Sequence, residues 1–297
     1  MILRINNLAK RYGNFTALYD VSFAIEKGSV FGILGPNGSG KTTTLGIILG
    51  VINASGGTYS WFDNQHSENP RRQIGAILET PNFYHYLSAY KNLQIAADIK
   101  GIGYDNIDKM LEVVNLKDRK NHRFSTFSLG MKQRLSIASA LLADPEVVVL
   151  DEPTNGLDPQ GIAEIRELII NIAKQGKTIL LASHMLDEVE KVCTHAAVLQ
   201  KGRIITSGKV SDILGNDDII EVLADDIEKL DLVAKAHPLI KSVNRNGGGK
   251  LELSFSTPVS TTDINDYFYK KGITLSYLVL RKKTLEAQFL ELTRQAK

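Results

Sequence analysis

Short runs of apolar, often β-branched residues alternate with amphipathic stretches over about the first 210 residues. Such runs are typical of buried strands, and the stretches between them have the spacing of helices with one apolar face. Buried strands separated by helices predict an α/β fold with a mainly parallel sheet and helices on its faces. The expected strands are residues 30–34, 74–78, 147–150, 178–182, 196–199 and 203–207, and the expected helices are residues 42–50, 132–143, 161–174 and 185–192.

The N-terminal segment has a different pattern. Residues 2–8 and 17–25 have the character of strands, and a turn signal at Gly13-Asn14 lies between them. Two strand patterns around a short turn predict an antiparallel hairpin. We therefore expect a small β subdomain at the N-terminus.

Residues 88–145 are mostly helical in pattern and lie between two of the expected strands. Ser88 is a suitable cap for a helix over residues 89–100, and a second helix is expected to start at Asp105. This arrangement predicts a helical subdomain that is inserted into the α/β fold.

The pattern changes again near Gly215-Asn216. The order strand, helix, strand, strand, helix, strand, followed by one more helix, fits a small ferredoxin-like α+β domain. We therefore expect two domains, residues 1–215 and residues 216–297. The expected strands of the second domain are residues 219–223, 240–244, 250–255 and 273–280, and its expected helices are residues 226–236, 261–271 and 284–294.

The composition indicates a globular protein. A hydrophobic fraction of 43% and a charged fraction of 23% exclude disordered and collagen-like classes. No apolar run approaches the roughly 20 residues that cross a bilayer, and the N-terminus has no signal-peptide core, so we expect a cytosolic protein that reaches a membrane through a partner. The 35 basic and 33 acidic residues disfavour binding to nucleic acid, and the single cysteine, Cys193, excludes an intrachain disulfide and a cysteine-based zinc cluster.

A phosphate-binding loop follows the expected strand at residues 30–34. The run from Gly35 to Thr42 matches G-x-x-x-x-G-K-[ST] between a strand and a helix, as this motif requires. Its glycines let backbone N–H groups point at phosphate oxygens, and the helix N-terminus adds partial positive charge. We expect Lys41 to reach the β- and γ-phosphates and the Thr42 hydroxyl to contact Mg²⁺. The predicted nucleotide contacts in this segment are Gly35, Pro36, Asn37, Gly38, Ser39, Gly40, Lys41, Thr42 and Thr43.

Two acidic residues follow the apolar run at residues 147–150. A buried strand would deliver Asp151 to the phosphate site, where it can hold Mg²⁺ directly or through water. Glu152 is then placed to polarise an attacking water as a general base, which favours hydrolysis. Kinases share the phosphate loop, so this feature alone does not decide between the two reactions. The sequence lacks the guanine-reading motif N-K-x-D, which disfavours a GTP switch.

Together, these motifs resemble those of the ATP-binding subunits of ABC transporters. Five separated motifs occur in the family's order over residues 2–210, which makes the resemblance specific. They are Tyr12, placed like the aromatic residue that stacks on adenine; the phosphate loop; the signature-like run Ser125–Arg134; Asp151–Thr154 with the D-loop-like Asn155–Asp158; and Ser183-His184, placed like the switch histidine.

The resemblance implies an ATPase that works as a pair of subunits. Ser128 and the backbone of Gly130 would bind the γ-phosphate of a nucleotide held by a second subunit, with Asp158 nearby. One chain has one phosphate loop and one signature, so two complete sites need two chains arranged head to tail. We expect an ATP-induced homodimer, or a heterodimer with a similar subunit. The implied catalytic residues are Glu152, His184 and Lys41, and the implied ligands are ATP and Mg²⁺.

Three positions depart from the family's pattern. Glu79 stands where the family usually has a glutamine that contacts Mg²⁺ and the attacking water. A carboxylate can still bind Mg²⁺, so the expected metal ligands are Thr42, Glu79 and Asp151. Glu79 also adds negative charge close to the phosphate groups, which bears on the affinity for nucleotide and on coupling to the permease. Leu129 and Met131 replace Gly and Gln in the signature, while the two phosphate-binding positions are kept.

Three sequence segments make the resemblance more specific. The segments ILET, FYHYLSAYKNL and FSLGMKQRL are similar to those of bacitracin- and lantibiotic-resistance exporters. Residues Pro81–Ile95 lie where the family receives the coupling helices of the membrane partner, or else they pack as an aromatic loop on their own helical block. We expect a cytoplasmic subunit, held at the inner face of the cell membrane by a separate permease that exports a peptide antibiotic, a drug or a related amphiphile.

Two other functions stay open. A soluble ABC-type ATPase could act on ribosomes or DNA, but ribosome-acting forms resemble two ATPase domains in one chain and DNA-repair forms carry long coiled-coil insertions. Here Lys41 and Asp151 are only 110 positions apart, and a single site is present. A nucleotide-binding regulator without turnover is disfavoured because the catalytic residues are intact. The second domain shows no recognisable chemistry, and a role in dimer contact or regulation is a hypothesis.

Overall fold

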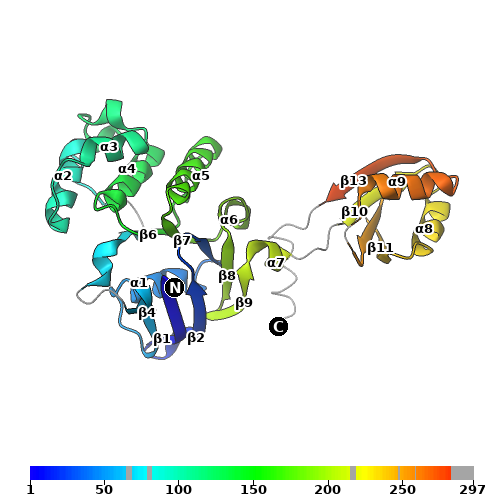
Figure 1. The fold of residues 1–297 in the computed structure, drawn as a ribbon, viewed down its shortest axis with the longest axis horizontal. Helices are drawn as coiled ribbons and strands as arrows, with labels where there is room; N and C mark the ends of the chain where they lie inside the picture. The colour runs from blue at the N-terminus through cyan, green and yellow to red at the C-terminus, as the bar shows by residue number, and fades with distance from the viewer. Residues whose placement is uncertain (65–68, 79–81, 215–218, 247, 258, 282–297) are drawn as a thin grey trace. The chain divides into compact units, whose positions relative to one another are not determined.

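The computed structural model describes the chain except for residues 65–68, 79–81, 215–218, 247, 258 and 282–297. The described residues form two compact units, one over residues 1–210 and one that begins at Ser211 (Figure 1). Each unit has its own hydrophobic core. We describe the two units separately.

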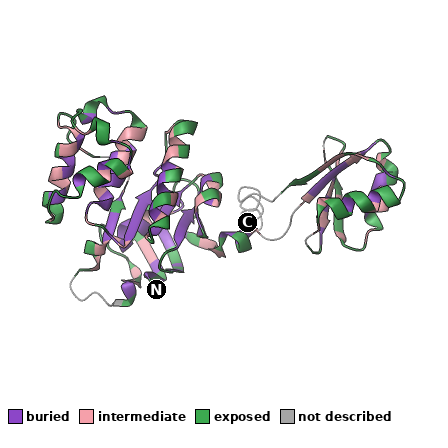
Figure 2. Ribbon diagram, turned by 45° about the horizontal axis from the view of Figure 1, so that its top comes forward, coloured by how far each residue is buried: buried purple, intermediate pink, exposed green. Residues whose placement is uncertain are grey.

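A six-stranded sheet forms the centre of the first unit. Its strands are β3 (Val30–Leu34), β5 (Ile74–Ile77), β6 (Val147–Asp151), β7 (Thr178–Ser183), β8 (His195–Gln200) and β9 (Arg203–Lys209). Their order is β5-β6-β7-β3-β8-β9, and all neighbours are parallel except β8 and β9, which confirms the mainly parallel sheet. Every residue of β3, β6 and β7 is buried, as expected of strands that are covered on both faces (Figure 2).

Three helices follow three neighbouring strands of this sheet. They are α1 (Lys41–Ile48) after β3, α5 (Pro159–Lys174) after β6 and α6 (Leu186–Val192) after β7. Because β6, β7 and β3 are adjacent and parallel, their carboxyl ends meet at one edge of the sheet, where open α/β folds bind ligands. The fold therefore brings the phosphate loop beside the residues that follow β6 and β7.

The N-terminal segment forms the predicted antiparallel hairpin, with one additional strand. The strands are β1 (Leu3–Tyr12), β2 (Phe15–Ile25) and β4 (Gly56–Trp61), in the order β2-β1-β4. The turn between β1 and β2 contains Gly13, whose φ of 54° suits glycine. The sequence did not predict β4, because its two glycines and few apolar residues give a weak strand pattern.

The inserted helical block is also present. It contains α2 (Ala89–Lys100), α3 (Ile107–Val113) and α4 (Leu129–Leu141). Ser88 caps α2 as predicted, and Gly101, with a φ of 68°, ends it. The fourth helix begins at Leu129 rather than at residue 132, because the Ser128 hydroxyl accepts a hydrogen bond from a backbone N–H and caps the helix at that point.

The second unit has the predicted ferredoxin-like arrangement. Its elements are β10 (Ile219–Ala224), α8 (Ile227–Lys235), β11 (Ile240–Arg245), β12 (Leu251–Phe255), α9 (Thr261–Lys270) and β13 (Leu275–Arg281). The strands pair in the order β11-β12-β10-β13, and every pair is antiparallel. The predicted helix at residues 284–294 lies outside the described residues. The remaining short elements are α7 (Val210–Leu214) and the 3₁₀ turns Phe62–Asn64, Pro70–Gln73, Lys117–Arg119 and Phe124–Thr126.

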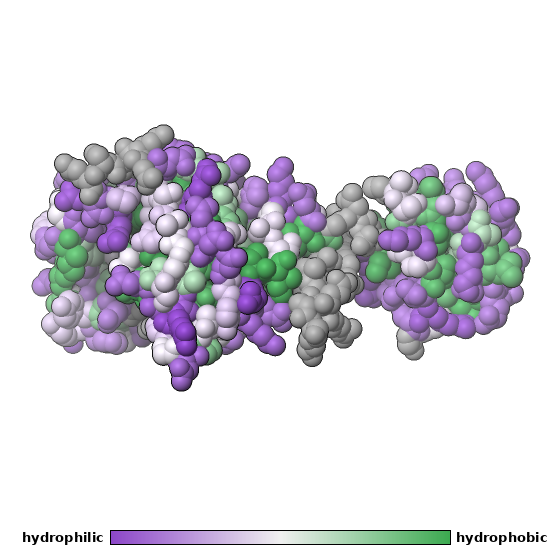
Figure 3. All heavy atoms as spheres, turned by 90° about the horizontal axis from the view of Figure 1, so that it is seen from below, coloured by the Kyte–Doolittle hydropathy of each residue, from purple (hydrophilic) through white to green (hydrophobic). Residues whose placement is uncertain are grey.

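Within the described ranges, the helices are too short or too polar to span a bilayer. Hydrophilic side chains are interspersed with apolar ones over the face shown in Figure 3.

Candidate functional site

Glycine residues shape the phosphate loop between β3 and α1. Gly38 has a φ of 78°, and Gly40, directly before α1, has a φ of 109°, which other residues rarely adopt. A Cβ atom on Gly40 would also lie 2.5 Å from Leu18 Cδ2 and 3.1 Å from the carbonyl oxygen of Ala17. Because no side chain caps α1, its first N–H groups are available to an anion such as phosphate.

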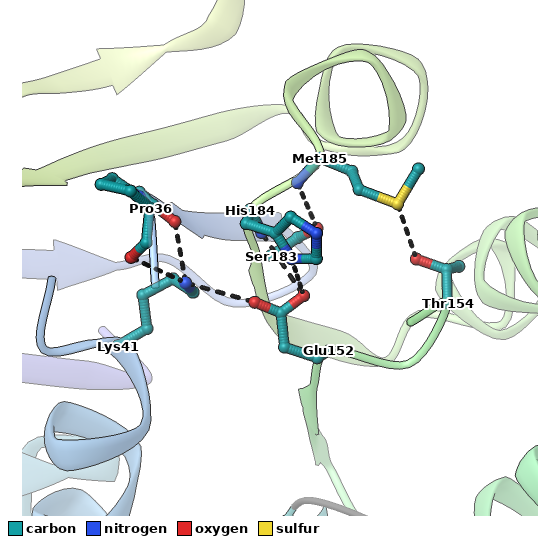
Figure 4. A network of polar contacts seen from close by, with 8 residues as sticks. Pro36, Lys41, Glu152, Thr154, Ser183, His184 and Met185 are labelled. Atoms are coloured by element: carbon teal, nitrogen blue, oxygen red, sulfur yellow. Dashed lines mark hydrogen bonds and ion pairs between the residues drawn. The ribbon is translucent and has the colours of Figure 1, made fainter. Parts of the chain in front are cut away.

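The side chain of Lys41 turns back into this loop. It is 5% exposed, and its Nζ donates hydrogen bonds to the carbonyl oxygens of Gly35 at 2.8 Å and Pro36 at 3.3 Å. Nζ also lies 3.2 Å from Glu152 Oε1 (Figure 4). Charge-assisted hydrogen bonds to oxygen are strong in such a sheltered place, so this ammonium group is well placed to bind phosphate oxygens.

The carboxylate of Glu152 connects Lys41 to His184. Glu152 has a φ of 48°, and its backbone N–H donates to the carbonyl oxygen of Ala182 in β7 at 2.9 Å. Its Oε2 lies 2.8 Å from His184 Nδ1 and accepts a longer bond of 3.4 Å from the His184 backbone N–H. Left-handed backbone costs a non-glycine residue about 1–3 kcal/mol and recurs at functional sites. The three residues named as catalytic thus form one network.

Two buried polar side chains flank this network. Asp151, the last residue of β6, is 2% exposed. Ser39 in the phosphate loop is also 2% exposed, and its hydroxyl has no hydrogen-bond partner among the described residues. An unpaired buried hydroxyl costs about 1–3 kcal/mol, and a bound phosphate group can remove that cost. The Asp151 carboxylate and the Thr42 hydroxyl are oxygen donors of the kind that Mg²⁺ prefers, whereas Glu79 lies outside the described residues.

A cleft of about 260 Å³ opens beside the phosphate loop. Tyr12 ends β1 and is 46% exposed, and Phe15, its cross-strand neighbour, is 63% exposed. Sequence reasoning missed Phe15, although a two-residue turn at Gly13-Asn14 would have placed it opposite Tyr12. The cleft can therefore offer two aromatic rings to a nucleotide base. It is lined by Tyr12, Phe15, Ala17, Asn37, Gly38, Gly40, Lys41, Thr42, Thr43 and Glu152.

The signature-like residues line a different cleft, of about 370 Å³. Ser128 caps α4 and Asp158 caps α5, where its Oδ1 accepts a hydrogen bond from the Gly161 N–H at 2.8 Å. Gly130 lies in the first turn of α4 and lines the same cleft. The two clefts have no lining residue in common. One chain therefore brings Ser128, Gly130 and Asp158 together, but not with Lys41 and Glu152.

By class, a chain with this phosphate loop and this carboxylate–histidine pair at the edge of a mainly parallel sheet is a P-loop nucleotide hydrolase. The family model for ABC transporters matches residues 18–155. The whole chain is 36% identical to an uncharacterized ABC transporter ATP-binding protein of Bacillus subtilis, 97% of which is covered. The chain belongs to the ATP-binding proteins of ABC transporters, and it is an ATP hydrolase.

Two further relatives carry more specific names. The bacitracin transport ATP-binding protein of Bacillus licheniformis is 35% identical over 98% of this chain and 97% of its own length. The lantibiotic transport ATP-binding protein of Streptococcus pyogenes is 41% identical over 69% of this chain and 89% of its own length. Similarity to both proteins agrees with the resemblance of the sequence motifs to those of bacitracin- and lantibiotic-resistance exporters.

Solved structures show the same fold. CbiO1 from Clostridium perfringens, part of an ABC transporter complex, has a TM-score of 0.66 and 29% identity, with 72% of this chain and 91% of that chain covered. A dimeric ATP-binding cassette bound to ADP and Pi has a TM-score of 0.63 and 25% identity, with coverage of 71% and 99%. ABC ATPase subunits dimerise and work with membrane permease components.

Proposed function

We propose that this chain hydrolyses ATP to drive a separate permease that exports a peptide antibiotic, a drug or a related amphiphile from the inner face of the cell membrane. The observation that carries the proposal is the similarity to a bacitracin transport ATP-binding protein over nearly the full length of both chains. The lantibiotic transport relative supports the same class of cargo. The relatives reported above offer no support for action on ribosomes or DNA.

In the proposed reaction, Glu152 accepts a proton from the water that attacks the γ-phosphate. His184 holds the carboxylate through the 2.8 Å contact with Oε2, and the other oxygen, Oε1, faces Lys41. The phosphate oxygens of ATP compete with Oε1 for the Lys41 ammonium group, because both are anionic acceptors. Binding of ATP would thereby free Oε1 to contact the attacking water.

Thr42 and Asp151 are proposed to hold Mg²⁺, with Glu79 as the third predicted ligand. The position of Asp151 supports this assignment, because it ends β6 at the edge of the sheet where the phosphate loop follows β3, and its carboxylate is an oxygen donor of the kind that Mg²⁺ prefers. When bound, Mg²⁺ would neutralise charge on the β- and γ-phosphate oxygens. The protein residues supply the oxygen donors and fix their positions.

The separation of the two clefts supports a head-to-tail dimer. Ser128 and Gly130 begin α4, and a helix N-terminus can bind a γ-phosphate that the partner holds. Asp158 lines the same cleft from the start of α5. Each nucleotide would then lie between the phosphate loop of one chain and the signature of the other. A homodimer meets this requirement with one kind of chain.

Tyr12→Ala is expected to raise the Kd for ATP by about 5- to 150-fold, because stacking on a base contributes about 1–3 kcal/mol. Phe15→Ala is expected to weaken binding in the same direction, since its ring lines the same cleft. Calorimetric titration with a non-hydrolysable ATP analogue measures both effects. Tyr19→Ala is a matched control, because this β2 ring contacts Arg203 and does not line the cleft. An unchanged Kd in Tyr12→Ala would reject the stacking role.

A groove of about 570 Å³ in the helical block supports contact with a permease. Phe83, which lines this groove, packs on the helical block, because its ring lies 5.2 Å from the ring of Phe124. Tyr86 and Ile99 instead face outward and are 70% and 82% exposed. We assign the groove to a coupling helix of the permease. It is lined by Asn82, Phe83, Tyr84, Asn92, Ile95, Ala96, Ile99, Lys100 and Ser139.

Cells that lack this protein are expected to become more sensitive to bacitracin or to a lantibiotic. Wild-type protein restores resistance, whereas Ile99→Asp does not, because a charged group in the groove opposes apolar docking. The purified Ile99→Asp protein should keep its ATPase rate to within about twofold, since Ile99 is a surface residue outside both clefts.

Val51→Asp is the matched control for this experiment, because Val51 is 71% exposed and does not line the groove. Unchanged sensitivity to both compounds would reject bacitracin and lantibiotics as the cargo, while full resistance with Ile99→Asp would reject the groove as the docking site. Purification in mild detergent tests the permease separately. We expect an integral membrane protein to copurify, and its absence would contradict the coupling.

A further inference from the structure

A sheltered ion pair links α5 to α6 outside the nucleotide cleft. Arg166 Nε donates to Glu188 Oε2 at 3.0 Å, and Arg166 Nη2 donates to Glu188 Oε1 at 2.8 Å. Glu188 is buried, and the Arg166 side chain is 26% exposed. Two parallel hydrogen bonds fix both the distance and the angle between guanidinium and carboxylate. This contact is therefore a rigid connection between the two helices.

Both helices begin directly after residues of the proposed site. The fifth helix follows the loop that ends at Asp158, and α6 starts two residues after His184. The same two segments are also joined by the Glu152–His184 contact and by the Thr154 hydroxyl, which lies 3.9 Å from Met185 Sδ (Figure 4). Three cross-links therefore connect the segment after β6 with the segment after β7.

The ion pair attaches the first turn of α6 to α5. This helix has seven residues, of which Glu188 and Val189 are buried. The exposed ion pair between Lys191 and Asp187 lies within α6, so it does not attach the helix to the fold. Loss of the Arg166 contact would leave the first turn of α6, and with it His184, less firmly placed.

We propose that Arg166 and Glu188 are positioning residues, which set the His184 imidazole against the Glu152 carboxylate by fixing α6 on α5. The inference rests on the proposed roles of Glu152 and His184. On this proposal, the position of the Glu152 carboxylate relative to His184 depends on a contact outside the nucleotide cleft. Neither residue lines that cleft or the signature cleft, so the pair acts through His184 and not on ATP itself.

The experiment is a double-mutant cycle with Arg166→Gln, Glu188→Gln and the combined variant. Each single variant is expected to lower kcat by about 10- to 100-fold, the scale of a small misplacement of a catalytic group. The KM for ATP should stay within about twofold. The combined variant should lose no more than either single variant, because both remove the same contact. Asp187→Asn is the matched control on the same turn and should keep the wild-type kcat.

A second measurement shows whether a lower kcat comes from a displaced His184 or from a smaller fraction of folded protein. Titration with a non-hydrolysable ATP analogue is expected to show unchanged stoichiometry and Kd in Glu188→Gln. Stoichiometry that falls in step with kcat, an unchanged kcat, or additive losses in the combined variant would each overturn the inference. Glu152→Gln distinguishes failure of the proposed base from failure of the proposed positioning role. If it still hydrolyses ATP, the proposed base is wrong; if it is inactive while Glu188→Gln is fully active, only the positioning role is wrong.

Discussion

Glu152→Gln is expected to lower the kcat for ATP hydrolysis by about 10²- to 10⁴-fold, the usual contribution of a positioned general base. Glutamine has nearly the same shape as glutamate but cannot take a proton from the attacking water. Binding of ATP should persist or tighten, because the substitution removes the carboxylate that competes with phosphate for Lys41. The variant therefore separates binding from turnover.

Phosphate release at saturating ATP measures this effect, and nucleotide titration measures the affinity. Glu146→Gln is a suitable control, because Glu146 lies just before the opposite end of β6 and pairs with Lys27 at the surface. Its kcat should stay within about twofold of the wild-type value. A near-normal rate in Glu152→Gln would show that another group activates the water.

Lys41→Ala is expected to abolish measurable turnover. The ammonium group is the cation that faces both the loop carbonyls and Glu152, and a single charge-assisted contact to developing charge is often worth about 10²- to 10³-fold in rate. The same change leaves Glu152 without its cationic neighbour, so ATP would meet an uncompensated negative charge. Binding should therefore weaken together with hydrolysis.

Turnover assays and analogue titration on the same preparation test this prediction. Lys27→Ala, which removes an exposed lysine of the same unit, should behave like the wild type. Tm should be recorded for both variants, because Lys41 also holds the carbonyl groups of Gly35 and Pro36. A wild-type rate in folded Lys41→Ala would reject the assignment of the phosphate site.

Much of the fold could be predicted because the central strands of the six-stranded sheet consist mostly of apolar residues. The runs that became β3, β6 and β7 are buried along their whole length, so hydrophobicity alone marks them. The strand β4 could not be found in this way. Trp61 pairs with Leu3, and its indole N–H donates to the carbonyl oxygen of Ile48 at 2.8 Å, so contacts distant in sequence determine that strand.

The candidate site was predictable as a set of residues but not as a geometry. Motif spacing identified Lys41, Glu152 and His184, yet their contact depends on the strand order β6-β7-β3, which the sequence does not state. The bond between Arg166 and Glu188 has no motif of its own, because 22 positions separate the two residues and either could be a solvated surface charge. Only packing of α6 on α5 reveals it.

Each ATP is proposed to lie between two chains, and the most direct test of this arrangement is the molar mass of Glu152→Gln with and without ATP. Light scattering is expected to give the monomer mass of 32.7 kDa without nucleotide and twice that mass with ATP. Ser128→Ala in the Glu152→Gln background should weaken the ATP-dependent dimer, because it alters the helix start proposed to meet the partner's γ-phosphate. A chain that binds ATP and keeps the monomer mass would contradict the shared site.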